Sequence, residues 1–374
     1  MSLRPSKNFK PKVVDLFSGA GGLSLGFCRA GFDVVAWVEK DIHTAETLRC
    51  NHTTSETKLS PVINKSIEHV MFNDIEARIE QAGSKQLDVL IGGPPCKGFS
   101  RSNKRTRTID NPMNSLYLHY LRFVEFLQPK VVVMENVSDM QSFAGGKVIE
   151  DIQNELERMG YRFNVKTLDA SNFGVPQVRN RTIIVAHRHN LNFVYPKGNN
   201  DVAPTVWDAI SDLPEVENGN LHDVLPYSTS PQTDYQRLMR ISEPSVANNL
   251  VTKNGELVLE RYSHIPQGGN WRNIPDNLMT NYTDKLRCHS WIYKRLPENA
   301  PSVTLTNFRK SMLIHPREDR GLSVREAARL QSFPDSYIFK GTINSQQQQV
   351  ADAVPVLMAE AVATEVLNAL HYTC

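Results

Sequence analysis

From residue 13 to residue 186, short apolar runs alternate with stretches in which apolar residues recur at helical spacing. The runs are bounded by glycine, proline or polar residues, and they predict strands at residues 13–17, 34–38, 61–63 (a weaker signal), 88–91, 131–134, 163–168 and 182–186. Helices are predicted between them at residues 23–27, 115–127 and 149–159. Because apolar strands alternate with helices, the pattern predicts an α/β fold with a mostly parallel sheet that is covered on both faces.

The pattern changes after residue 188. From His189 to about Arg320 the periodicity is weak, and proline, asparagine, serine and threonine are frequent, which predicts a smaller, loop-rich domain. Helical periodicity returns at residues 323–331 and 355–370, and the glutamine tract at 346–349 is interpreted as a loop or a helix start. We expect a first domain at 1–188, the loop-rich domain at 189–345, and a C-terminal helical segment at 346–374.

Distinctive residues follow the strongest predicted strands. A glycine turn at residues 19–22 follows the first strand, and Glu39 follows the second. Cys96 comes after the strand at 88–91, and Glu135 after the strand at 131–134. Ligands of parallel sheets bind beyond the carboxyl ends of the strands, so this alignment predicts one active site.

Composition limits the possible classes of protein. Of 374 residues, 40% are hydrophobic and 22% are charged, which suffices for a sizeable core and two domains, while a net charge of +2 identifies no partner. The five cysteines are scattered without a CxxC pair, which argues for a reducing compartment and against a zinc site or disulfide framework. The sequence has no apolar run of membrane-spanning length and no signal-peptide core, so we expect a cytoplasmic protein without membrane contact or metal.

Cys96 is the candidate nucleophile. It stands in GGPPCKGFS, residues 92–100, where paired glycines allow a sharp turn and paired prolines stiffen it. A thiol on a rigid turn after a buried strand is well placed for nucleophilic catalysis. A small buried cysteine is the alternative interpretation, but it does not explain the prolines or the basic segment that follows.

The segment after Cys96 carries several basic residues before the first acidic one. They are Lys97, Arg101, Lys104, Arg105 and Arg107. A solvated basic face is the ordinary interpretation of such a run. Beside a nucleophile, the same residues predict a loop that closes over a polyanion and neutralises its phosphates.

The glycine turn at 19–22 departs from the dinucleotide-binding pattern GxGxxG, because Ser24 stands where the third glycine would be. A cofactor with an adenosine but no pyrophosphate fits this turn better. Glu39, at the end of the next strand, can bind the hydroxyls of a ribose. An ordinary tight turn between strand and helix is the alternative.

Two further groups are candidates for binding a substrate. Glu135 is expected at the edge of a pocket, where a carboxyl group retains its proton more readily and can donate a hydrogen bond. Gln177, Arg179 and Arg181 share one face if their segment is extended, which suits binding of a phosphate or a carbonyl. The alternatives are a solvated loop acid for Glu135 and surface solubility for the other three.

Six motifs in this order resemble those of the cytosine-5 DNA methyltransferases of the bacterial modification type. They are DLFSGAGGL at 15–23 (cofactor loop), GPPC at 93–96 with GFS at 98–100 (nucleophile), ENV at 135–137 (base binding), NFGVPQVRNR at 172–181 (glutamine–arginine–arginine motif), residues 320–334 (scaffold for target recognition) and AVP at 353–355 (tail of the last motif). Six motifs in the right order and spacing are far more specific than any one of them.

The resemblance implies a Rossmann-like methyltransferase domain, a target-recognition domain at 189–345, and a final helix that returns to the first domain. It implies methyl transfer from S-adenosylmethionine to carbon 5 of a cytosine flipped out of a specific duplex DNA sequence, through an adduct with Cys96. The catalytic residues would be Cys96, Glu135, Arg179 and Arg181. The cofactor residues would be Phe17, Gly19, Ala20, Gly22, Leu23, Glu39, Lys40, Ile67, Pro94, Leu116, Asp352 and Val354. DNA contacts are expected from Lys97, Ser100, Arg101, Lys104, Arg105, Gln177 and Thr304.

Residues 267–271, with sequence QGGNW, and a basic–aromatic run at 285–295 also fit DNA contacts, ordinary surface being the alternative. The chain departs from the family at Lys97, which replaces a glutamine, and at Asp352, which replaces an asparagine. The family's acidic motif that contacts the adenine is also unusual here. Ser66-Ile67 follows the strand without an acid, and Asp74-Ile75 has the acid but comes late in the sequence. Ile67 is favoured for the adenine contact.

One rival interpretation is a transfer-RNA cytosine-5 methyltransferase, in which threonine usually stands at the position of Ser100. Another is a catalytically dead DNA-binding relative. Every catalytic position of the family is filled in this sequence, which argues against this second rival. The expected partner is double-stranded DNA, with a restriction endonuclease of the same site as a further candidate. We expect a monomer.

Overall fold

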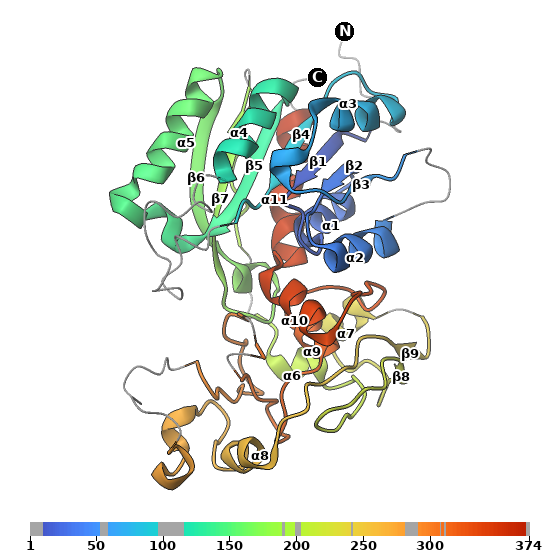
Figure 1. Ribbon diagram of the computed structural model, residues 1–374, viewed down its shortest axis with the longest axis vertical. Helices are drawn as coiled ribbons and strands as arrows, with labels where there is room; N and C mark the ends of the chain where they lie inside the picture. Colours follow the sequence, from blue (N-terminus) through green and yellow to red (C-terminus); the bar gives the residue numbers. More distant parts are fainter. Residues whose placement is uncertain are drawn as a thin grey trace. The chain divides into compact units, whose positions relative to one another are not determined.

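The computed structural model describes residues 10–52, 59–95, 116–188, 191–198, 203–240, 242–280, 291–306, 308–309 and 312–371 (Figure 1). The chain forms two compact units. Unit 1 comprises residues 1–170, 180–199 and 356–374, and unit 2 comprises residues 171–179 and 200–355. The two segments of unit 2 therefore interrupt unit 1 along the sequence. The last helix of unit 1 comes from the end of the chain.

Unit 1 contains a seven-stranded sheet in the order β3-β2-β1-β4-β5-β7-β6. The strands are β1 (Lys12–Leu16), β2 (Asp33–Val38), β3 (Val62–Ile63), β4 (Val89–Gly92), β5 (Val131–Val137), β6 (Arg162–Asp169) and β7 (Asn180–His187). Neighbours from β3 to β5 pair in parallel, whereas β7 runs antiparallel to both β5 and β6. All seven predicted strands are confirmed, with ends shifted by a few residues.

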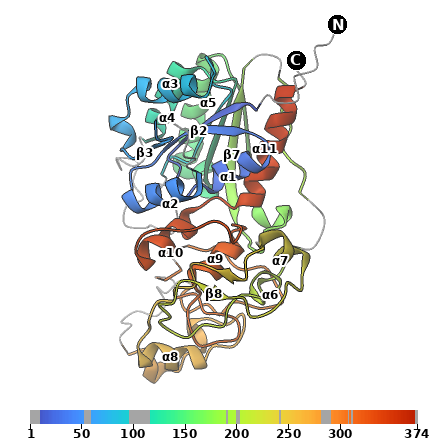
Figure 2. The same cartoon turned by 90° about the vertical axis from the view of Figure 1, so that its right-hand side faces the viewer.

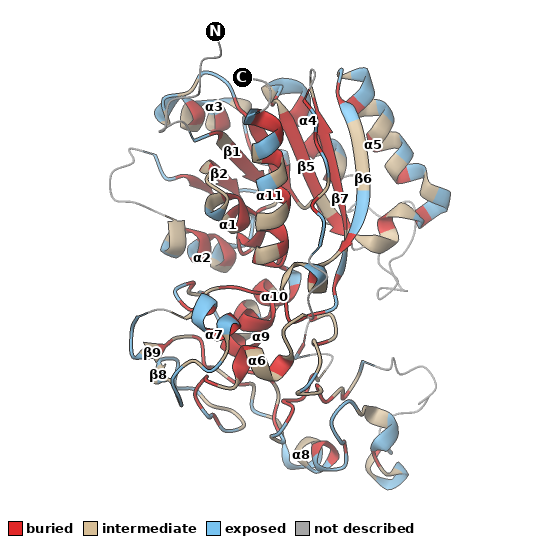
Figure 3. Cartoon of the chain, turned by 180° about the vertical axis from the view of Figure 1, so that it is seen from behind, coloured by how far each residue is buried: buried red, intermediate tan, exposed pale blue. Residues whose placement is uncertain are grey.

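Helices cover both faces of this sheet (Figures 1 and 3). They are α1 (Gly22–Arg29), α2 (Ile42–His52), α3 (Phe72–Gln81), α4 (Leu116–Leu127), α5 (Lys147–Arg158) and α11 (Val356–His371). On one face, buried residues of α3, α4 and α5 form a continuous apolar cluster with Val14, Leu16, Leu90 and Val132 of the strands. On the other face α1 packs against α11, and the fit is close because a Cβ on Gly26 would lie 2.5 Å from the Cβ of Ala359.

Tyr120 of α4 fixes the two strands that precede the candidate nucleophile and Glu135. Its hydroxyl lies 2.9 Å from the carbonyl oxygen of Leu90 in β4 and 3.1 Å from that of Val133 in β5. Gly92 ends β4 without a side chain, since a Cβ there would lie 2.3 Å from the carbonyl oxygen of Leu16. The carboxyl ends of β1, β4 and β5 are thereby held in close register.

Unit 2 has short elements joined by long loops (Figure 2). They are α6 (Val206–Ile210), α7 (Asp234–Met239), α8 (Glu256–Ser263), α9 (Val324–Leu330), α10 (Ile343–Asp352) and a two-stranded sheet of β8 (Leu225–Pro226) and β9 (Ser245–Val246). The glutamine tract at 346–349 lies inside α10, so its interpretation as a loop or helix start is wrong. Three of its side chains are buried and donate hydrogen bonds, to Gly341, Thr252 and Lys340.

The interior of unit 2 contains buried charges. Arg329 donates through Nε and Nη2 to both carboxylate oxygens of Asp335, at 2.6 Å each, and its Nη1 lies 3.2 Å from Oδ1 of Asp212. Arg320 makes a similar two-pronged contact with Glu326, at 2.8 and 2.9 Å. Buried ion pairs of arginine with acidic residues thus occupy part of the interior of unit 2. None of the described helices is long and apolar enough to cross a membrane.

Candidate active site

The turn after β1 forms the first part of the candidate site. Its backbone is left-handed at Phe17, Gly19 and Gly21, with φ of 56°, 52° and 77°. Such values are strained for phenylalanine and ordinary for glycine. A Cβ on Gly19 would meet nothing within 4 Å, so the backbone there faces open space. The turn thus offers bare backbone that a ligand can approach closely.

The carboxylate of Glu39 connects this turn to the end of β2. Its Oε2 accepts a hydrogen bond from the N–H of Gly19 at 3.0 Å, and its Oε1 accepts one from the N–H of Asp41 at 2.8 Å. Burial raises the pKa of Glu39, and the two N–H donors oppose this rise because they favour the ionised form. The remaining lone pairs of the carboxylate can accept hydrogen bonds from ribose hydroxyls beside the turn.

Three of the expected cofactor residues contribute to the apolar cluster under the sheet. Phe17 follows β1, Ile67 follows β3, and Leu116 begins α4. Ala20, Gly22 and Leu23 are buried at the start of α1, whereas Lys40 is exposed. Asp74, the alternative at the adenine, pairs with Lys65 at 2.9 Å. Ile67 and Ile75, the neighbour of Asp74, both lie in this cluster, so the expected adenine contact stays a prediction.

Asp15, a buried acid in β1, is a candidate that the sequence motifs did not indicate. Its Oδ2 has no hydrogen-bond partner among the described residues. Burial raises the pKa of this carboxyl group to about 8. The hydrogen bond to Ser24 lowers the pKa by less than burial raises it, and the negative charge of Glu39 adds a smaller rise. The signal in the sequence is a lone acid inside the apolar run at 13–17. An unpartnered polar atom beneath the glycine turn is what a polar ligand at this turn would complete.

The segment that leads to Cys96 lies against the end of β5. Nδ2 of Asn136 donates a hydrogen bond to the carbonyl oxygen of Pro94 at 3.1 Å. A Cβ on Gly93 would lie 3.0 Å from Oε2 of Glu135, so the missing side chain leaves room for that carboxylate. The structure therefore brings together the residues that follow β4 and the acid of β5.

Glu135 forms an ion pair with Arg181, with 2.8 Å between Oε1 and Nε. The register explains the contact, because Val137 lies opposite Arg181 and Glu135 opposite Ile183, which makes Glu135 and Arg181 diagonal neighbours on one face. About one eighth of each side chain is exposed (12% and 13%), enough for a ligand to reach both. Here a carboxylate and a guanidinium present acceptor and donor atoms side by side.

This arrangement differs from the sequence-based expectation in one way. β5 continues through Glu135 to Val137, because β7 pairs with it over its whole length. The proton expected on Glu135 stays a prediction.

The expected nucleophile and most of the expected DNA contacts lie outside the described residues. These are Cys96, Lys97, Ser100, Arg101, Lys104 and Arg105. The described chain ends at Pro95 and resumes at Leu116. The described contacts nearest to these residues in the sequence are those of Gly93 with Glu135 and of Pro94 with Asn136.

Gln177 and Arg179 lie inside unit 2. The amide of Gln177 is fully buried; it donates to the carbonyl oxygen of Leu330 at 3.0 Å and accepts from the N–H of Leu305 at 3.0 Å. Arg179 is 1% exposed and donates to the carbonyl oxygens of Leu305, Ala351 and Ala353 at 2.9 to 3.1 Å. These contacts favour a positioning role for both residues over direct contact with a substrate.

The other expected site residues of unit 2 differ in their exposure. Thr304 is half-buried, and its hydroxyl donates to the carbonyl oxygen of Val178 at 2.8 Å. Asp352 is exposed and accepts a hydrogen bond from Gln348 at 2.7 Å, whereas Val354 is buried. Their expected contacts with DNA or cofactor stay predictions.

Comparison with known proteins identifies the family. The model of the C-5 cytosine-specific DNA methylases matches residues 11–368. The chain belongs to this family. It is a DNA (cytosine-5)-methyltransferase, which confirms the resemblance of its motifs, and enzymes of the family generally use S-adenosylmethionine as methyl donor.

Relatives of the methyltransferase include bacterial modification enzymes. It is 34% identical over 356 residues to the type II methyltransferase M1.HphI of Haemophilus parahaemolyticus, covering 95% of this chain and 86% of the relative. It is 31% identical over 382 residues to M.DdeI of Desulfomicrobium norvegicum, with 95% and 88% covered. A crystal structure described as a DNA modification methyltransferase encoded within an E. coli prophage superimposes with a TM-score of 0.76 at 26% identity, covering 96% of this chain and 99% of that one. The expected fold class is confirmed.

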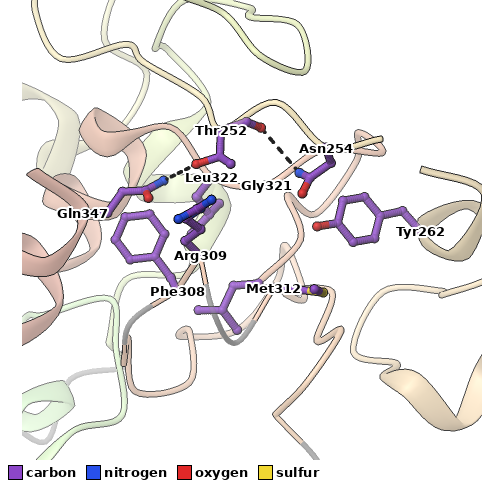
Figure 4. Close-up of a pocket in the computed structure, with 10 residues that line it drawn as sticks. Thr252, Asn254, Tyr262, Phe308, Arg309, Met312, Gly321, Leu322 and Gln347 are labelled. Carbon is purple, nitrogen blue, oxygen red and sulfur yellow. Dashed lines mark hydrogen bonds between the residues drawn. The ribbon is translucent and has the colours of Figure 1, made fainter. Parts of the chain in front are cut away.

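A separate hollow of the methyltransferase lies within unit 2 (Figure 4). Thr252, Tyr262, Arg309 and Gln347 are among the residues that line it, and Nε2 of Gln347 donates to the hydroxyl of Thr252 at 2.9 Å. None of the expected catalytic or cofactor residues lines this hollow. Among the described residues, no group of three or more His, Cys, Asp or Glu could hold a metal ion.

Proposed function

We propose that this methyltransferase acts on a cytosine flipped out of a specific duplex DNA sequence, and that Cys96 forms a covalent adduct with it. The observation that supports this most directly is the Glu135–Arg181 pair beside Gly93 and Pro94. A cytosine presents a ring nitrogen, an exocyclic amine and a carbonyl oxygen along one edge. A carboxylate next to a guanidinium complements that edge, and the chain that carries Cys96 starts beside both.

The chemistry requires a nucleophile because carbon 5 of cytosine is weakly nucleophilic. Addition of the Cys96 thiolate to carbon 6 moves electron density to carbon 5, which can then accept a methyl group. Loss of the proton from carbon 5 and of the thiolate from carbon 6 restores the aromatic ring. One difficult substitution is thus divided into an addition, a transfer and an elimination.

Glu135 and Arg181 would hold the cytosine as charge develops on the ring. Glu135 would hold the ring nitrogen and the exocyclic amine, and Arg181 would bind the carbonyl oxygen. Because the pair is already formed at 2.8 Å, its donor and acceptor need little reorganisation. Arg179 would act as a positioning residue, through the three carbonyl oxygens that it holds.

S-adenosylmethionine would supply the methyl group from its sulfonium, with the neutral thioether S-adenosylhomocysteine as the leaving group. The left-handed turn at Phe17–Gly19, the carboxylate of Glu39 and the apolar surface at Ile67 and Leu116 fit its methionine, ribose and adenine parts. Pro94 and Val354 would complete the site, as would Asp352 despite its departure from the family's asparagine. No dinucleotide is required, since the glycine turn lacks the third glycine.

Unit 2 would recognise the DNA sequence, with residues 189–345 as target-recognition domain and 346–374 returning to the catalytic domain. The basic residues that follow Cys96 would neutralise phosphates around the flipped base. We propose a bacterial cytoplasmic enzyme that acts as a monomer. The type II relatives suggest that a restriction endonuclease recognising the same site accompanies it.

The test is methylation of unmethylated plasmid DNA with labelled S-adenosylmethionine, beside Cys96→Ser and Cys50→Ser. Cys50 is exposed on α2 and serves as the matched control. Label at one cytosine context, mapped by bisulfite sequencing and lost only in Cys96→Ser, would support the proposal. Label in bulk RNA but not in DNA would contradict the substrate, and equal activity of Cys96→Ser would contradict the mechanism.

A further inference from the structure

Residues 266–273 of unit 2 form a turn of fixed backbone shape, here called the glycine-pair turn. The N–H of Gly268 donates to the carbonyl oxygen of Arg295 at 3.1 Å, and the N–H of Arg295 donates back to Gly269 at 3.2 Å. Trp271 donates its N–H to Ile292 at 3.2 Å. The turn is therefore paired along its length with the segment 292–295, rather than projecting as an independent loop.

Side chains within the turn stabilise the same shape. Oδ1 of Asn270 accepts from the N–H of Arg272 at 3.0 Å, and Oδ1 of Asn273 accepts from the N–H of Asn270 at 3.0 Å. Each asparagine thus satisfies a backbone donor that the turn would otherwise leave to water. A loop that served only as a connection would not need so many internal constraints.

The two glycines are required for different reasons. A Cβ on Gly269 would lie 2.7 Å from Oδ1 of Asn273 and 2.8 Å from the carbonyl oxygen of Pro266, so packing demands glycine there. Gly268 has φ of +73°, but a Cβ on it would meet nothing within 4 Å. Gly268 is exposed, and its bare backbone faces open space. A close approach by another molecule is one reason for such a position.

The surroundings of Gly268 are basic and aromatic. The ammonium group of Lys294 donates to the carbonyl oxygen of Gly268. The guanidinium of Arg272, an exposed residue, lies 5.2 Å from the ring centre of the half-buried Trp271. Gln267 is also exposed; its Oε1 accepts a hydrogen bond from the N–H of Glu298 at 3.1 Å, which leaves its amide NH₂ for a ligand. Positive charge, an aromatic side chain, an amide and bare backbone together suit a nucleic-acid surface.

Arg295, although part of the basic run at 285–295, has no donor left for DNA. It is 5% exposed, and its five N–H donors meet five acceptors. Four are carbonyl oxygens within 2.6 to 3.0 Å, and the fifth is the carboxylate of Asp319. The carbonyl oxygens belong to Tyr262, Ile265, His315 and Glu318. Arg295 thus ties the end of α8 and the segment 315–319 to the strand-like segment that holds the turn.

We propose that the glycine-pair turn contacts the DNA and that Arg295 is the positioning residue that fixes it for sequence recognition. The proposal rests on unit 2 being the target-recognition part of the methyltransferase. Lys294 and Arg272 would contact phosphates, Gln267 would reach a base edge, and Gly268 would let the backbone lie against the duplex. Arg295 would not touch the DNA; it would act by holding the glycine-pair turn and its contact residues in position.

The first test is Gly268→Asn beside Gly160→Asn. Both glycines are exposed, have positive φ (+73° and +84°) and have open space around the position of a Cβ. Asparagine tolerates such φ values, so both variants should fold and melt like the wild type. Gly160 follows α5 in unit 1 and is not among the expected DNA contacts. We expect Gly268→Asn to weaken binding of the duplex mapped by bisulfite sequencing at least tenfold, and Gly160→Asn to leave it unchanged.

The second test is Arg295→Lys, which keeps the charge but loses the five-donor fork. We expect KM for the DNA to rise about tenfold and discrimination against a duplex with one base pair changed to fall by a similar factor. At saturating DNA, kcat should stay within about twofold, and the Kd for S-adenosylmethionine should not change. A purely structural role would lower the melting temperature without altering discrimination.

The outcomes separate this inference from the proposed function. If the wild type methylates DNA but Gly268→Asn binds the duplex as well as Gly160→Asn does, the turn is not a DNA contact. If Arg295→Lys retains full discrimination, Arg295 is not its positioning residue. If the wild type transfers no methyl group to DNA, the proposed function fails before either variant is considered.

Discussion

Asp15 illustrates how a single side chain can couple the cofactor turn to the solution pH. It is buried within β1, one oxygen lacks a partner among the described residues, and burial raises the pKa of its carboxyl group to about 8. In an unfolded chain the same group has a pKa near 4, so the folded protein retains a proton that the unfolded chain loses. Stability contributed by this proton is complete below about pH 4 and is lost progressively as the pH rises toward 8.

Replacement of Asp15 by asparagine should therefore flatten the dependence of stability on pH. The wild type should lose on the order of 1 kcal/mol per pH unit from this group between about pH 5 and pH 8, whereas the variant should not. Urea unfolding at four pH values within this window measures the difference. Parallel curves for the two proteins would show that Asp15 does not bind an extra proton in the folded state.

Glu135 and Arg181 act on the substrate rather than on stability. Glu135→Gln keeps the shape of the side chain but removes the negative charge that Arg181 faces. We expect kcat to fall by about 10²- to 10³-fold, because a stabilising contact to the developing charge is lost. The Kd for S-adenosylmethionine, measured by calorimetry, should be unchanged. A decrease in cofactor affinity that accounted for the whole loss would instead place Glu135 in the cofactor site.

At the scale of elements, the contact of α1 with α11 depends on Gly26. The position of its missing side chain is occupied by the backbone and Cβ of Ala359, at 2.5 to 2.7 Å. The same two helices are joined at the surface by the ion pair of Arg29 and Glu360, at 2.6 Å. Close backbone approach thus replaces the larger side chains that usually fill the space between helices.

Gly26→Ala should destabilise the protein by about 2–3 kcal/mol. The free-energy cost of forcing a methyl group into this rigid contact exceeds the gain in helix propensity from replacing glycine by alanine. Propensity alone would give a stabilisation of about 1 kcal/mol, so the sign of the change is diagnostic. Gly255→Ala is the control, because a Cβ there meets nothing within 4 Å and its φ is −75°. Thermal unfolding followed by circular dichroism gives both values, and a stabilised Gly26→Ala would refute the close contact.

The strands of unit 1 could be predicted because central parallel strands are apolar on both faces. α2 was not predicted, since it has few apolar residues, and α10 was misjudged because its buried side chains are glutamines with hydrogen-bond partners far away in the sequence. In the site, the order of strand ends indicated Glu39 and Glu135. The pairing of Glu135 with Arg181 could not be predicted, because it depends on the antiparallel register of β7.

At the scale of the whole molecule, the two units differ in what fills their interiors. Unit 1 has a continuous apolar cluster, whereas unit 2 buries Arg329 between Asp212 and Asp335. Removal of one partner from such a network leaves charges buried without compensation. The two units should therefore respond differently to substitutions that remove charge.

Arg329→Met should lower the stability of unit 2 by about 3 kcal/mol and leave unit 1 nearly unaffected. Hydrogen exchange followed by mass spectrometry resolves the two, through peptides from α9 and from the strands β1 and β4. We expect faster exchange in α6, α7 and α9 only. Equal loss of protection in the central strands would show that the two units unfold as one.

The return of the chain to unit 1 has a consequence for biosynthesis. Arg29 and its partner Glu360 are 331 positions apart, and α1 packs against α11 over the same distance in sequence. A ribosome adding about 5–20 residues per second makes α11 roughly 15–70 s after α1. During that interval the face of α1 that packs against α11 lacks its native cover, and transient packing or a chaperone would have to shield it. The first helix made is among the last to reach its final environment.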